Sequence, residues 1–124
     1  MAISADFSKL VSHLMHSRNQ AHVYHLQTKS FAEHMALNGY YDNIIDLVDG
    51  LIESYQGKNG IIDKYTSFEL NNYKSKKETI NYFTALQKNV DSLREDVDDS
   101  YIQNQIDTVT ELIQSTIYKL SYLA

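Results

Sequence analysis

The sequence contains no cysteine and no proline, and only four of its 124 residues are glycine. Without cysteine the chain has no disulfide, no thiolate metal ligand and no cysteine nucleophile, which fits a protein of the reducing cytoplasm. Proline and glycine are the residues that most often interrupt helices, and all four glycines fall between Gly39 and Gly60. The chain is therefore predicted to be mostly α-helical.

Long apolar runs and an excess of positive charge are also missing. No stretch approaches the ~20 apolar residues that are needed to cross a bilayer. The amino-terminal sequence MAISADFSKLVSHLMHS lacks the uninterrupted apolar core and the cleavage pattern of a signal peptide. The net charge of -5 argues against binding nucleic acid through a basic surface, because contacts to phosphate supply most of that affinity. We expect a cytoplasmic protein that binds neither membranes nor nucleic acid.

What the chain does contain is the composition of one globular domain. Hydrophobic residues make up 43% of the sequence and charged residues 22%, values that are ordinary for soluble proteins. At 124 residues the chain is long enough to bury one core and too short for two independent ones. We therefore expect residues 1–124 to form a single helical domain.

Apolar residues recur at the helical period along the first part of the chain and predict a helix over residues 5–29. His25 lies in the centre of its apolar face and is expected to point into the core. His13 and His16 fall on the opposite face, among serine, asparagine and glutamine, and are expected to be surface residues.

Two capping boxes mark the starts of the second and third helices. In this motif a serine accepts from the backbone N–H of the third residue on, and a glutamate at that position binds the N–H of the serine. Ser30 with Glu33 and Ser75 with Glu78 both match it. The second helix is expected to extend to about residue 56, where the sequence QGKNG supplies residues for a turn.

The third helix is predicted to end at Val97, where Asp98, Asp99 and Ser100 cap a fourth helix that extends towards the end of the chain. Residues 61–72 carry a weaker pattern for a short helix within the connection. Four amphipathic helices predict an all-α fold, a four-helix bundle. The longer crossover between the second and third helices favours the ferritin-like type over a plain up-down-up-down bundle.

Four polar side chains lie in or beside the apolar face of the second helix: His34 within it, and Asn38, Asp49 and Glu53 along its edge. His34 and Asn38 form one pair, and Asp49 and Glu53 the other, each at a spacing that makes the two side chains neighbours. His34 and Asp49 are separated by roughly 22 Å along a straight helix. The two pairs can share a metal only if the second helices of two copies cross antiparallel in a two-fold dimer.

The stretch YHLQTKSFAEHMALNGYYDNIIDLVDGLIES resembles the signature region of the Dps proteins, which are small ferritins named for DNA protection in starved cells. Tyr24-His25, Phe31 and His34 match its aromatic and histidine positions, and Asp49 with Glu53 match its acidic pair. The final segment IQSTIYKLSYLA is also similar to the last helix of that family. Dps proteins oxidise and store iron at a site shared across a two-fold dimer interface.

The resemblance implies a set of metal ligands: His25, His34, Asn38, Asp49 and Glu53. In this set the histidines supply imidazole nitrogens, Asp49 bridges the metals and Glu53 binds terminally. Asn38 stands where the family has an aspartate, and an amide is a weaker, uncharged donor. Leu26 replaces the usual tryptophan, and ungapped counting makes His22 an alternative to His25.

Two functions follow as expectations from different classes. The first is a Dps-like protein that binds iron, or another divalent metal, and oxidises and stores it within a homo-oligomer of two-fold dimers and a dodecamer-like shell. It acts as a ferroxidase against oxidative stress if the shared site is intact. The alternative is a degenerate ferritin-like bundle, such as a phage-encoded one, that serves as a non-catalytic interaction or assembly protein. Asn38 and Leu26 favour the alternative.

Overall fold

The computed structural model describes residues 5–124, which form four α-helices and no strand. The helices are α1 (Ala5–Gln27), α2 (Phe31–Asn59), α3 (Lys76–Asp96) and α4 (Ser100–Tyr122). The predicted all-α class and the four-helix bundle are confirmed. Residues 1–4, which begin the stretch predicted to hold no signal peptide, lie outside the described residues. Within residues 5–124, no helix is both long and apolar enough to span a membrane.

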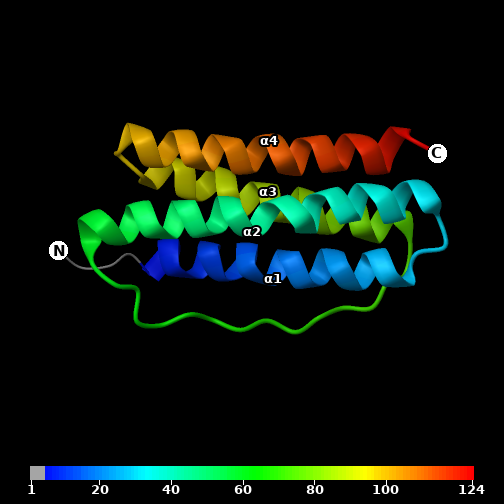
Figure 1. Ribbon diagram of the computed structural model, residues 1–124, viewed down its shortest axis with the longest axis horizontal. Coiled ribbons are helices and arrows are strands. Elements are labelled where there is room, and N and C mark those ends of the chain that lie inside the picture. Colours follow the sequence, from blue (N-terminus) through cyan, green and yellow to red (C-terminus); the bar gives the residue numbers. More distant parts are fainter. Residues whose placement is uncertain (1–4) are drawn as a thin grey trace.

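The four helices form a bundle with one long crossover (Figure 1). Helix α1 packs on α2, α2 on α4, α4 on α3, and α3 on α1, so α2 and α3 are not principal neighbours. Figure 1 shows α2 and α3 running in the same direction, joined by a link that follows the length of the bundle. This connectivity is the single-crossover arrangement that the sequence predicted.

Apolar side chains from all four helices form one core. Fully buried members include Leu14 on α1, Tyr40 on α2, Phe83 on α3 and Ile113 on α4. The Tyr40 hydroxyl does not remain unpaired in this core, because it lies 2.7 Å from the hydroxyl of Ser17, which is also buried. Burial raises the pKa of Tyr40 well above its ordinary value.

The capping box at the start of α2 forms only in part. Ser30 accepts from the backbone N–H of Glu33 at 3.2 Å, as predicted. The Glu33 carboxylate accepts instead from the hydroxyls of Thr28 at 3.2 Å and Tyr73 at 2.7 Å. The N–H of Ser30 donates to the Thr28 hydroxyl. Glu33 thus joins the α1–α2 turn to the crossover, a contact that local sequence does not encode.

The end of α2 and the start of α4 both differ from the prediction. Helix α2 continues to Asn59, three residues beyond the expected end, and Gly60 follows with a φ of 92°. Positive φ carries no steric cost in glycine, and the Gly60 N–H donates to the carbonyl of Gln56 at 2.9 Å. Asp99 precedes α4 but does not cap it through its side chain, because its carboxylate lies 2.6 Å from the ammonium of Lys58.

The crossover, residues 60–75, contains no helix, so the short helix expected within residues 61–72 is wrong. Its backbone is bound by polar side chains of α1. Ser12 accepts from the N–H of Thr66 at 3.0 Å. Gln20 accepts from the N–H of Asn71 and donates to its carbonyl, both at 2.7 Å. Because α1 side chains satisfy these groups, the crossover needs no helix of its own.

The crossover also covers the two histidines that were expected to be exposed. His13 is half-buried, and its ring stacks on Phe68 with ring centroids 4.0 Å apart. His16 donates from Nε2 to the carbonyl of Glu69 at 2.9 Å, and its Nδ1 accepts from the Tyr82 hydroxyl at 3.2 Å. The prediction of a surface pair is wrong because a distant segment packs over the polar face of α1.

Candidate functional site

The turn between α1 and α2 brings His25 and His34 together. His25 lies in the last turn of α1 and His34 in the first turn of α2. Their rings stack with centroids 3.6 Å apart and an interplanar angle of 19°. Each ring is hydrogen-bonded to the backbone of the other residue: His25 Nδ1 lies 2.7 Å from the His34 carbonyl oxygen, and His34 Nδ1 lies 2.9 Å from the His25 carbonyl oxygen.

These reciprocal hydrogen bonds determine which nitrogen of each ring carries hydrogen. A carbonyl oxygen can only accept, so Nδ1 is the donor in both His25 and His34. In the neutral rings this leaves a lone pair on each Nε2. An Nδ1–H bond to a backbone carbonyl is the support that commonly orients a metal-binding imidazole. Both Nε2 atoms of the pair are therefore available as metal ligands. The same hydrogen bonds also stabilise the turn between α1 and α2.

The two histidines differ in exposure. His25 is 7% exposed, which confirms its predicted inward position. His34 is half-buried and helps to line a shallow pocket of about 280 Å³ with Thr28, Lys29, Ser30 and Phe31. This pocket gives a small ion access to His34, whereas His25 does not line it.

Asn38 and Tyr41 form a hydrogen-bonded extension of the pair. The Tyr41 hydroxyl donates to Asn38 Oδ1 at 2.8 Å, and Asn38 Nδ2 donates to Asp42 at 3.0 Å. The edge-to-face contact of Tyr41 with His25 places their ring centroids 5.2 Å apart. Tyr41 was not predicted to hold Asn38, and the signal in the sequence that could have found it is its spacing of three residues from Asn38. The amide oxygen keeps one lone pair for a further ligand.

The geometry distinguishes His25 from His22, the alternative left open by the sequence. His22 is half-buried, and its ring packs on Tyr41 at a centroid distance of 4.6 Å. Its centroid is 6.0 Å from that of His25. His25 alone of the two is hydrogen-bonded to His34. His25 is therefore the hydrogen-bonding partner of His34, whereas His22 packs against Tyr41.

Asp49 and Glu53 are exposed on α2 and are not brought to the histidine pair within one chain. Among the residues that the structure describes, no group of three or more histidine, cysteine, aspartate or glutamate side chains could hold a metal ion. Two imidazoles and an amide are too few protein ligands for Fe²⁺ in a closed site. The predicted ligand set fits iron only if a second copy supplies the carboxylates.

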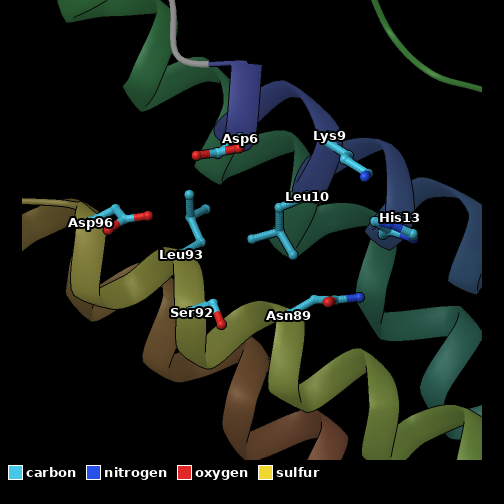
Figure 2. A pocket seen from close by; sticks show the side chains of 8 residues that line it. All are labelled: Asp6, Lys9, Leu10, His13, Asn89, Ser92, Leu93 and Asp96. Carbon is cyan, nitrogen blue, oxygen red and sulfur yellow. The ribbon is translucent and has the colours of Figure 1, made fainter.

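A separate groove of about 290 Å³ lies between the beginning of α1 and the end of α3. Figure 2 shows Asp6 and Asp96 at one end of this groove and Lys9 and His13 towards the other. Burial, and then electrostatic interaction with Lys9 and His16, lower the pKa of His13. The groove lies at the opposite end of α1 from His25 and contains none of the predicted ligands.

These features define a small four-helix bundle with a long crossover and a hydrogen-bonded histidine pair at one corner. Residues 25–120 match the model of a protein family of unknown function, DUF5856, and the chain belongs to this family. The matched region begins at His25 and includes His34, Asp49 and Glu53.

A relative in Enterobacteria phage T4 is similar over most of both chains. It is an uncharacterised 14.6 kDa protein of the mobD–ri intergenic region. It is 30% identical to this chain over 108 residues, which cover 87% of this chain and 82% of the T4 protein. No solved structure shows a significant match. None of these findings tests the resemblance to Dps proteins, which stays a prediction.

Proposed function

We propose that this protein binds Fe²⁺ between two copies of the chain and oxidises and stores it, as the small ferritins do. In each site His25 and His34 come from one copy, and Asp49 and Glu53 come from the other. The observation that carries the proposal is the reciprocal hydrogen bonding of the histidine pair. It fixes both rings and leaves both Nε2 atoms with lone pairs for a metal.

The ligands divide the chemistry between them. The imidazole nitrogens of His25 and His34 bind Fe²⁺ without adding charge, and the carboxylates of Asp49 and Glu53 neutralise it. Oxygen or hydrogen peroxide is the oxidant that takes one electron from each Fe²⁺. Open coordination positions on the iron give the oxidant access. Tyr41 and Asp42 hold the Asn38 amide beside the site.

The remaining expectations belong to the same proposal. Two-fold dimers assemble further into a dodecamer-like shell that stores the oxidised iron, and the protein works in the cytoplasm. The absence of cysteine supports a reducing compartment. A divalent metal other than iron would use the same ligands, since imidazole and carboxylate bind several first-row metals.

An anaerobic Fe²⁺ titration followed by addition of oxygen or peroxide tests the proposal. We expect saturable Fe²⁺ binding and rapid oxidation in the wild type, and loss of both in Glu53→Gln. Asp46→Asn is the matched control, because Asp46 is also exposed on α2 but is not a proposed ligand. Iron binding and oxidation equal to a buffer blank in the wild type would refute the function.

A second candidate is a non-catalytic assembly protein, and a specific observation favours it. Leu26, Phe31 and Met35 are large apolar side chains that are exposed near the histidine pair. Exposed apolar residues that gather in one region are typical of protein-binding surfaces. In this case the histidine pair only stabilises the turn, and a phage-encoded protein would assemble through this surface. Under this candidate, wild-type copies associate without taking up iron, and the double variant Phe31→Ser/Met35→Ser no longer associates.

A further inference from the structure

The outward side of α2 divides into an apolar half and an acidic half. We define the α2 outer face by six exposed residues that fall on one stripe of the helix: Phe31, Met35, Asp42, Asp46, Asp49 and Glu53. Phe31 and Met35 are 76% and 52% exposed and lie in the first two turns. The four carboxylates occupy the remainder of the face. In an antiparallel crossing, the apolar half of one copy meets the acidic half of the other.

The positions of the proposed ligands specify one register for this crossing. The midpoint between His34 and Glu53 and the midpoint between Asn38 and Asp49 both fall between Asn43 and Ile44. One two-fold axis at this point therefore pairs His34 with Glu53 of a second copy and Asn38 with its Asp49. His34 and Glu53 each lie about 14 Å from the axis along α2, so the helices must cross at a shallow angle.

The same register places like charges at the centre of the interface. Asp42 and Asp46 lie on either side of the axis, so the four carboxylates of the two copies approach one another there. Within the described residues, the two ion pairs join Lys58 to Asp99 and Arg94 to Asp107, and neither involves the α2 outer face. Asp42 accepts a hydrogen bond from the neutral amide of Asn38, which does not offset its charge.

Two metal-free copies are therefore opposed by charge along the face that they must share. Like charges in close contact destabilise an interface unless a cation compensates for them. The apolar contacts come from Phe31 and Met35 at the ends and do not cover the acidic centre. A divalent cation between His34 of one copy and Glu53 of the other adds both attraction and positive charge.

We propose that the two-fold dimer forms only when its shared sites hold a divalent metal, so that metal binding controls assembly. This inference rests on the proposed function, since it concerns the same site. Linkage requires the converse as well: if metal strengthens the dimer, higher protein concentration strengthens metal binding by the same factor. Association would then be a readout of metal that does not depend on oxidation.

Light scattering under anaerobic conditions, with chelator or with Fe²⁺, tests this inference. We expect a monomer in chelator and a doubling of the molar mass in Fe²⁺, with the doubling lost in Glu53→Gln. The double variant Asp42→Asn/Asp46→Asn removes central charge but no proposed ligand, and it should dimerise without metal. Glu95→Gln/Asp96→Asn makes the same charge change on α3, where both side chains are exposed, and should behave as the wild type.

Each other outcome overturns a different claim. A wild-type dimer in chelator that still binds Fe²⁺ contradicts metal-controlled assembly and leaves the shared site standing. A monomer that binds Fe²⁺ normally contradicts both the inference and the shared site. A monomer that takes up no Fe²⁺ contradicts the proposed function. A monomeric Asp42→Asn/Asp46→Asn variant in chelator contradicts charge as the cause.

Discussion

At the scale of single residues, the molecule shows how strongly a side chain depends on segments far away in sequence. His13 belongs to the polar face of α1, yet the crossover buries part of its ring against Phe68. Burial and electrostatic interaction with Lys9 and His16 lower the pKa of His13. The folded protein therefore binds a proton at His13 more weakly than the unfolded chain does.

This difference predicts a pH dependence of stability. Because the folded-state pKa lies below the unfolded value of 6.5, the contribution of His13 is fully present above 6.5 and is lost as the pH falls from there through the folded-state pKa. We expect His13→Gln to lose less unfolding free energy than the wild type between about pH 7.5 and about pH 5.5. Urea denaturation at the two pH values measures this. An equal loss in both proteins would show that His13 does not contribute.

The residue scale also defines how far the candidate site could be predicted. Helical periodicity places His25 on the inner face, where the structure also has it, and Asp49 and Glu53 at the edge of the apolar face of α2, where the structure has both side chains exposed. Periodicity cannot give rotamers or hydrogen-bond partners. The stacking of His25 on His34 and the bond from Tyr41 to Asn38 therefore could not be predicted.

At the scale of elements, the local sequence predicted the helices correctly but not the conformation of the crossover. Serine caps at Ser30 and Ser75 are formed as predicted, because an N-cap involves residues only three positions apart. The weak apolar pattern at residues 61–72 suggested a helix. Its backbone is instead bound by Ser12 and Gln20, more than fifty residues earlier in the chain. Non-local contacts of this kind override local propensity.

Gln20 should be the most important of these contacts. It is fully buried and makes two hydrogen bonds to the backbone of Asn71. We expect Gln20→Ala to lower the unfolding free energy by about 2 kcal/mol, because two buried backbone groups lose their partners. Hydrogen exchange at the Asn71 amide should accelerate as well. Asn19→Ala, at an exposed neighbouring position, is the control and should change neither quantity. Unchanged exchange in Gln20→Ala would contradict the role of α1 in holding the crossover.

At the scale of the whole molecule, the central claim concerns two copies rather than one. One chain brings together His25, His34 and Asn38, and the carboxylates of Asp49 and Glu53 lie elsewhere on α2. Sequence spacing could predict this separation because the rise of a helix is fixed. It could not establish the second copy, since a helical period carries no information about which surfaces of two molecules meet.

A mixing experiment tests the shared site most directly. One copy carries His34→Gln and the other Glu53→Gln, and each variant alone should fail to bind Fe²⁺. A mixed dimer has one damaged site with both substitutions and one intact site, because a two-fold interface pairs each histidine with the carboxylates of the other copy. Because only mixed dimers contain an intact site, and assembly requires metal, mixing should restore up to about half of the wild-type Fe²⁺ sites per chain. No restoration in a mixture that forms mixed dimers, or full binding by either variant alone, would contradict a site built from two copies.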